Sequence, residues 1–297
     1  FSAQCGILTL FNAKKCGFPQ RKNLAACVWG AGKGRTLCAK MERRCTERGE
    51  ASVKKRILLG LISVFKALYN AVYAVMKLRP MQKKVVMISR QSNSQRPDFE
   101  QLGAEIEARD PGVRLVYLCR EMGDTPLELL RYCFHLQHCA AELSTAHVCI
   151  IDGYCIPVSV LHHRKELRVV QVWHALGAIK KFGRQALSVP GGRDKELAER
   201  MGMHKHYDAV LCASHRTAKA YEEAFGVSAD KMRVTGVPRV DAILKMNRAR
   251  CRRRFFAAYP ELRGQKIVLY APTFRDGEQM PEIEPLITAA EKMGMLL

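Results

Sequence analysis

The sequence predicts an α/β fold built on an open parallel sheet with helices on both faces. From about residue 83 onward, short apolar runs rich in β-branched residues alternate with helical patterns. These runs are apolar at consecutive positions rather than at every second one, which is typical of strands buried on both faces. With 48% hydrophobic and 26% charged residues in a chain of 297, a sizeable core can form.

Seven apolar runs are predicted to be strands, and the helical patterns fall between them. The predicted strands cover residues 85–89, 113–118, 147–152, 167–173, 208–214, 232–236 and 266–271. The predicted helices cover residues 98–108, 126–144 and 214–226.

Polar clusters follow six of these runs, and ligands of open parallel sheets bind beyond the carboxyl ends of the strands. The clusters bring cationic side chains to one edge, a set suited to a phosphate-bearing ligand. Its members are Arg90, Lys180, Lys181, Arg216, Arg239 and Arg275. Any one of them alone also fits a solvated loop charge, so the prediction rests on the six in register.

His174 follows the predicted strand 167–173 and begins a glycine-containing turn. A neutral imidazole at this edge can accept a proton from a hydroxyl nucleophile, the usual role of a general base. The alternative is a structural histidine hydrogen-bonded at a turn. His204 and His206 have no third metal ligand nearby in the sequence, so a surface role is expected for them.

The net charge is +21, and residues 1–60 supply +10 of it, with 13 Lys and Arg against three acidic residues. Residues 1–50 show no sustained periodicity and are expected to form a basic, poorly ordered extension. Such a surplus implies an anionic partner. A nucleic acid is not expected, because aromatic residues total 7% and no helix-turn-helix, RRM or zinc-finger signature occurs.

Residues 51–80 contain a twenty-residue apolar stretch, 57–76, with basic flanks. Ser63, Lys66, Asn70 and Lys77 fall on one helical face and leave the rest apolar. This pattern predicts a helix lying on an anionic membrane surface. A transmembrane span and a core helix are the alternatives.

The twelve cysteines contain no CxxC pair, and Cys5, Cys16, Cys27 and Cys38 recur every 11 residues, which does not fit structural zinc. Neither a metal nor another cofactor is expected. The cysteines in apolar strands behave as small hydrophobes, which suits a reducing cytoplasm.

Four ordered segments resemble the CDP-glycerol glycerophosphotransferases of teichoic acid synthesis. They are VVMISRQSNSQRPDF (85–99), QVWHALGAIKKFG (171–183), the segment 212–244 with its GVPR, and VLYAPTFRD (268–276). The resemblance covers about residues 55–297. It implies a GT-B architecture, with an N-terminal Rossmann-like, acceptor-side domain at 81–245 and a linker helix and the start of the nucleotide-binding domain at 246–297.

The resemblance also implies an activity and a place in the cell. A peripheral enzyme on the cytoplasmic face of the cell membrane would transfer glycerol phosphate from CDP-glycerol to a lipid-linked, undecaprenyl-type acceptor and release CMP. His174 takes the catalytic-base position. The expected CDP-glycerol contacts are Ala175, Leu176, Gly177, Ala178, Arg239, Pro272 and Thr273.

Two departures from the family pattern qualify this expectation. Ala175 replaces a glycine, and a positive φ there would strain an alanine by about 1 kcal/mol. The family's second histidine and Ser-Ser motif have no counterpart after Glu278, so a chain truncated in the second domain and inactive as a fragment is expected. A CDP-ribitol donor, a non-catalytic membrane scaffold and a nucleic-acid-binding protein are the alternatives.

Overall fold

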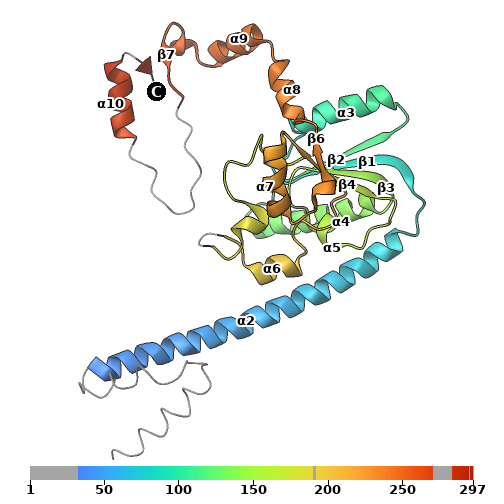
Figure 1. The fold of residues 1–297 in the computed structure, drawn as a ribbon, viewed down its shortest axis with the longest axis vertical. Coiled ribbons are helices and arrows are strands. Elements are labelled where there is room, and N and C mark those ends of the chain that lie inside the picture. The colour runs from blue at the N-terminus through green and yellow to red at the C-terminus, as the bar shows by residue number, and fades with distance from the viewer. Residues whose placement is uncertain (1–32, 190–191, 270–282, 294, 297) are drawn as a thin grey trace, which may run out of the picture. The chain divides into compact units, whose positions relative to one another are not determined.

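A computed structural model describes residues 33–189, 192–269, 283–293 and 295–296, with side chains for residues 53–189, 192–269 and 283–293. Its centre is a sheet of six parallel strands in the order β2-β1-β3-β4-β5-β6 (Figure 1). The strands are β1 (Gln82–Ser89), β2 (Arg114–Cys119), β3 (Ala146–Ile151), β4 (Arg168–Gln171), β5 (Ala209–Cys212) and β6 (Met232–Val234). The predicted parallel α/β sheet is therefore confirmed, with strand ends within a few residues of the predicted ones.

The strand order reverses between β1 and β3, because the chain passes from β1 to β2 on one side and returns to β3 on the other. In open α/β sheets a ligand crevice lies at such a reversal, beyond the carboxyl ends of the strands. Ser89 ends β1 and Asp152 directly follows β3, so both lie at this point.

Helices cover both faces of the sheet. They are α3 (Pro97–Arg109), α4 (Pro126–Leu143), α5 (Ile156–Val160), α6 (Lys195–Arg200), α7 (His215–Phe225) and α8 (Pro238–Leu244). Local sequence sets their starts: Thr125 and Glu128 form a reciprocal capping box at α4, and Ser214 caps α7. Short 3-10 turns occur at Gly183–Ala186 (η3) and Ala229–Lys231 (η4).

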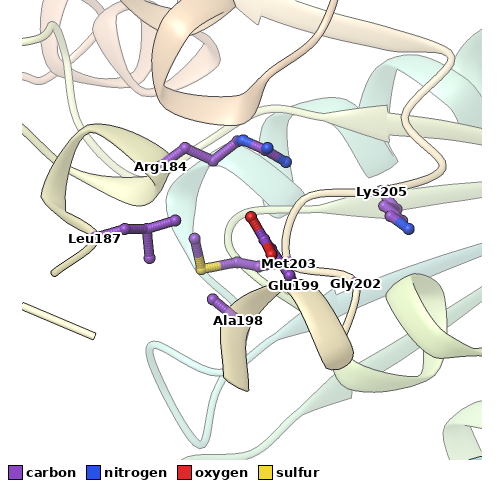
Figure 2. Close-up of a pocket in the computed structure, with 7 residues that line it drawn as sticks. All are labelled: Arg184, Leu187, Ala198, Glu199, Gly202, Met203 and Lys205. Atoms are coloured by element: carbon purple, nitrogen blue, oxygen red, sulfur yellow. The ribbon is translucent and has the colours of Figure 1, made fainter. Parts of the chain in front are cut away.

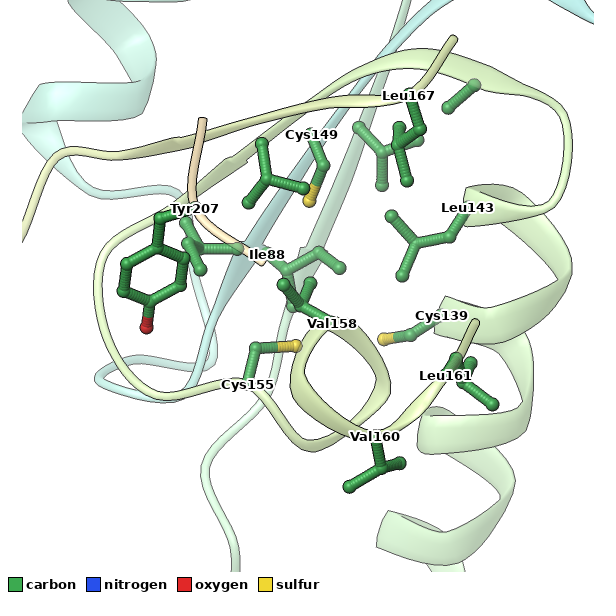
Figure 3. Packing of buried hydrophobic residues seen from close by; sticks show 14 of the residues in the cluster. Ile88, Cys139, Leu143, Cys149, Cys155, Val158, Val160, Leu161, Leu167 and Tyr207 are labelled. Carbon is green, nitrogen blue, oxygen red and sulfur yellow. The ribbon is translucent and has the colours of Figure 1, made fainter. Parts of the chain in front are cut away.

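Alternate residues of β1 enter two separate hydrophobic clusters, as the period-two geometry of a strand requires. Val86 and Ile88 pack with residues of α4, α5 and α7, and this is the larger cluster (Figure 3). Val85 and Met87 pack on the opposite face with Phe99 of α3. Both faces of the sheet are thus buried, which explains why its strands are apolar at consecutive positions.

Helix α2 (Lys33–Met76) begins well before the predicted helix 57–76 and extends into the segment for which no regular structure was expected. Residues 33–50 are rich in Arg, Glu and Lys, which favour helix without requiring an apolar face. Residues 1–32 lie outside the described part. The chain divides into two compact units, residues 1–65 and residues 66–297.

Within the second unit, the end of α2 packs on the sheet domain through its polar face. Lys66 and Lys77 donate to the carbonyls of Arg200 and His162, both at 2.7 Å, and Asn70 donates to Val160 O at 3.0 Å. Tyr69 and Tyr73 are buried in the larger cluster. The outer side chains, Leu68, Val72 and Val75, are 63%, 45% and 66% exposed.

The residues after α8 form α9 (Arg248–Ala258), the 3-10 turn η5 (Pro260–Leu262), β7 (Lys266–Ile267), α10 (Glu284–Lys292) and β8 (Met295–Leu296). Strands β7 and β8 pair in parallel as a separate two-stranded sheet. Of the predicted strand 266–271, Lys266–Ile267 belong to this separate sheet, and residues 270–271 lie outside the described part.

Candidate functional site

His174 lies just beyond β4, at the carboxyl edge of the sheet, where its Nδ1 is 2.8 Å from the main-chain oxygen of Asp152. A carbonyl oxygen only accepts, so Nδ1 carries the hydrogen and Nε2 carries the lone pair. Burial lowers the pKa of His174 below its usual value, and the positive charges of Arg96 and Arg239 lower it further. The imidazole is therefore neutral near pH 7 and can accept a proton at Nε2.

The residue before it, Trp173, fixes the position of the turn. Its main chain has φ of 57°, in the left-handed region, and its ring is buried and stacked on Phe182 at 4.6 Å. Gln171 joins two loops, since its side chain accepts from Trp173 N at 2.9 Å and donates to Gly153 O at 3.1 Å. A bulky residue in this conformation is strained, and the aromatic packing holds it there.

Arg239 and Asp98 form a buried ion pair that reaches His174 from the other side. Asp98 accepts from the main-chain nitrogen and Nε of Arg239, both at 2.9 Å, and pairs with Nη2 as well. Arg239 Nη1 donates to the main-chain oxygen of His174 at 2.7 Å. The pair links α3 to α8 and holds both to the His174 turn.

A second buried carboxylate, Asp152, lies at the strand reversal. Its Oδ2 accepts from Ser89 Oγ at 2.7 Å and is 3.6 Å from Arg96 Nε. Burial raises the pKa of Asp152, while the Ser89 hydrogen bond and the Arg96 charge oppose the rise. Its Oδ1 is buried and has no hydrogen-bond partner among the described residues.

A cavity of about 360 Å³ opens beside His174. Three cations from three different segments line it, namely Arg90, Lys181 and Arg193, together with the aromatic rings of Tyr154, Trp173 and Phe182. Among the described residues, its lining contains no aspartate or glutamate. A smaller cavity of about 180 Å³ lies next to it, shares Met203, and is lined by Arg184, Glu199 and Lys205 among others (Figure 2).

The structure brings some of the predicted edge residues together and separates others. His174, Arg90 and Lys181 line one cavity, and the Arg239 guanidinium binds the His174 carbonyl. Leu176 is half exposed in the turn, and Ala178 and Lys180 are exposed as well. Pro272, Thr273 and Arg275 lie outside the described residues.

The strain expected at Ala175 is not present. Four non-glycine residues of the described part have positive φ, and Ala175 is not one of them. The left-handed residue of this turn is Trp173, so the alanine is accommodated without strain.

The surface role expected for His204 is wrong. His204 is 4% exposed, its Nδ1 contacts the Tyr207 hydroxyl at 2.9 Å, and burial lowers its pKa to about 3. Four aromatic side chains of the core surround it, which the sequence MGMHKHYD does not reveal. His206 is exposed, as expected. In the described ranges no three His, Cys, Asp or Glu residues are grouped so that they could hold a metal ion.

Sequence reasoning missed Asp98 and Arg193, and it placed Asp152 only within the polar cluster after the run 147–152, with no role of its own. Asp98 sits in the first turn of a helix, where an acidic residue is ordinary because of the helix dipole. Its partner is 141 positions away. Arg193 lies in a polar loop and carries no local signal, and the position of Asp152 after a strand does not reveal that its side chain is buried.

The model of the CDP-glycerol:poly(glycerophosphate) glycerophosphotransferase family matches residues 71–293, well over half of the chain. The chain belongs to this family. A teichoic acid ribitol-phosphate primase of Bacillus spizizenii is 31% identical over 217 residues, which are 72% of this chain and 56% of the primase. A teichoic acid glycerol-phosphate primase of Bacillus subtilis is 30% identical over 142 residues, 48% of this chain and 36% of the relative.

A solved structure of the wall teichoic acid polymerase TagF, soaked with CDPG, has the same fold. Its TM-score is 0.55 at 15% identity, over 82% of this chain and 63% of TagF. This confirms the GT-B-like fold class. The chain thus spans between about a third and two thirds of the length of these family members.

Proposed function

We propose that this protein transfers glycerol phosphate from CDP-glycerol to the terminal hydroxyl of a lipid-linked polyol phosphate acceptor, with His174 as general base. The observation that carries the proposal is the hydrogen bond from His174 Nδ1 to Asp152 O, which leaves Nε2 as the proton acceptor beside a cation-lined cavity. Family membership supports the reaction class.

In the proposed reaction, His174 Nε2 takes the proton of the acceptor hydroxyl, and the oxygen attacks the phosphorus that bears the glycerol. The bond from that phosphorus to the bridging oxygen breaks, and CMP leaves with the electron pair. Phosphoryl transfer depends mainly on positioning and on cations that offset the charge. Ala175, Leu176, Gly177 and Ala178, with Arg239, Pro272 and Thr273, are proposed to contact the donor. Arg239 has two N–H groups beyond those bound to Asp98 and His174.

CDP-ribitol is the second candidate donor. The relatives named ribitol-phosphate primase and glycerol-phosphate primase are 31% and 30% identical to this chain, so similarity does not favour either polyol.

The membrane attachment is also proposed, and the end of α2 supports it. Residues 53–76 are long and apolar enough to cross a membrane, with mean hydropathy 1.6. Yet Lys66, Asn70 and Lys77 bind carbonyls of the sheet domain, which leaves Leu68, Val72 and Val75 as an outward apolar stripe. This arrangement favours a helix lying on the cytoplasmic membrane surface over a span for residues 66–76.

The test is CMP release from each CDP-polyol by the full-length protein, which carries the complete second domain, in the presence of a lipid-linked acceptor. His174→Ala is expected to lower the rate by about 10²- to 10⁴-fold, the usual contribution of a general base. His147→Ala is the matched control, because His147 Nδ1 also contacts a main-chain oxygen, at 2.6 Å, but near the amino edge of the sheet. Unchanged release in His174→Ala, or no release with either donor, contradicts the proposal.

A further inference from the structure

The cavity beside His174 has the chemistry of an anion site. Arg90 follows β1, Lys181 precedes η3, and Arg193 precedes α6, so three separate segments place cations around one volume. No carboxylate among the described residues lines it. Loop cations that only contact solvent are not expected to surround a single cavity.

None of the three cations forms an ion pair within the described ranges, in contrast to Arg239. Arg90 Nη1 donates weakly to Tyr154 O at 3.3 Å, and its buried Nε has no partner among the described atoms. Its guanidinium lies over the Tyr132 ring at 6.0 Å, and that of Arg193 lies over Tyr154 at the same distance. The aromatic faces hold these groups in place without using their hydrogen-bond donors.

The position of the cavity tells which side of the reaction it serves. His174 lines it, so a group bound there lies on the side from which the nucleophilic hydroxyl approaches. In an in-line transfer the attacking and leaving oxygens lie on opposite sides of the phosphorus. The leaving CMP therefore points away from this cavity.

We propose that this cavity binds a phosphate of the acceptor's own polyol phosphate chain, next to the hydroxyl that His174 deprotonates. Arg90 and Arg193 would bind the phosphate oxygens, and Trp173 and Phe182 would face the apolar edge of the polyol. The proposal rests on the proposed function. Its consequence is that acceptors bearing a polyol phosphate are preferred over those ending in an uncharged sugar.

Binding measured on the purified full-length protein tests this proposal without requiring the transfer reaction. In an NMR titration, glycerol 3-phosphate should bind and glycerol should not. Arg193→Gln and Arg90→Gln should each lower the affinity for glycerol 3-phosphate by about 10-fold or more, because hydrogen bonds to charged groups are stronger than those between neutral groups. Arg90→Lys should keep part of the affinity. Arg114→Gln, which removes one charge at the start of β2, is the matched control and should bind as the unmodified chain does.

A titration with CDP-glycerol distinguishes a binding site for the donor from a binding site for the acceptor. The affinity for CDP-glycerol should be unchanged by Arg193→Gln. Arg193 is exposed, and thermal unfolding of the variant checks that it is folded. No binding of glycerol 3-phosphate to the unmodified chain, equal binding by all variants, or an equal loss for CDP-glycerol would each overturn the assignment. The proposed function fails by a different result, unchanged CMP release in His174→Ala.

Discussion

The ion pair between Asp98 and Arg239 makes a quantitative prediction about stability. The side chain of Asp98 is 1% exposed and that of Arg239 is 16% exposed. With 2.9 Å between Asp98 Oδ2 and Arg239 Nε, their attraction is about 6 kcal/mol at an effective dielectric constant of about 20. Much of this offsets the desolvation of the two charges. Removing one partner is different, because it leaves the other charge buried, at a cost of about 3–5 kcal/mol.

Asp98→Asn keeps the shape of the side chain and removes its charge, so we expect it to lower the free energy of unfolding by about 3 kcal/mol or more. The measurement is urea unfolding followed by circular dichroism, with the slope compared between variants. Glu105→Gln is the control, because its pair with Arg109 is exposed, at 65% and 82%. That substitution should cost less than about 1 kcal/mol.

The double variant Asp98→Asn with Arg239→Gln completes the test. Removing both charges leaves no buried charge unpaired, so its cost should be well below the sum of the single costs. If Asp98→Asn costs no more than Glu105→Gln, or if the two single costs add, the pair does not hold α3, α8 and the His174 turn together.

Three further predictions follow from other residues. His204 has a pKa of about 3 in the folded protein and about 6.5 in the unfolded chain. Between these pH values the unfolded chain therefore binds more protons. The free energy of unfolding should thus fall as the pH drops from about 6.5 toward 3. In urea unfolding at several pH values, His204→Asn, which tolerates the positive φ of 61°, should flatten that decline; an unchanged slope contradicts it. Gly183→Ala should lower the melting temperature clearly, because φ is 55° and a Cβ would lie 2.3 Å from Ala224 O, whereas Gly177→Ala, with no atom within 4 Å, should not. Val72→Glu should reduce flotation with anionic liposomes while the control Val234→Glu, also exposed, should not; equal flotation refutes the α2 surface.

Much of the fold could be predicted because its determinants are local. The run VVMIS indicates a strand buried on both faces, and its alternate residues indeed enter two clusters. The polar face of α2 could also be read from spacing, but not its partner. Lys66, Asn70 and Lys77 bind main-chain oxygens far along the chain, and no periodicity encodes such contacts.

The site was predictable only in part, for the same reason. His174 could be found because it ends an apolar strand, and the edge residues because parallel strands end at one side of a sheet. The bond to Asp152 O, the Asp98 and Arg239 pair and the burial of His204 all depend on packing between distant segments. Sequence reasoning therefore placed His174, Arg90 and Lys181 at one edge of the sheet, where the structure has them, but could not tell that Arg239 is held by a carboxylate.

The docking of α2 has a consequence for how this domain tolerates sequence change. Its three anchoring side chains bind the carbonyls of Arg200, Val160 and His162, which every amino acid possesses. Substitutions at those three positions therefore leave the acceptors in place, provided the main chain at the ends of α5 and α6 and at His162 keeps its course. The side chains that cannot change freely are those of the helix, because Lys66, Asn70 and Lys77 set the rotation of α2 about its own axis. Relatives can thus diverge in the side chains of the receiving segments while the helix presents the same face outward.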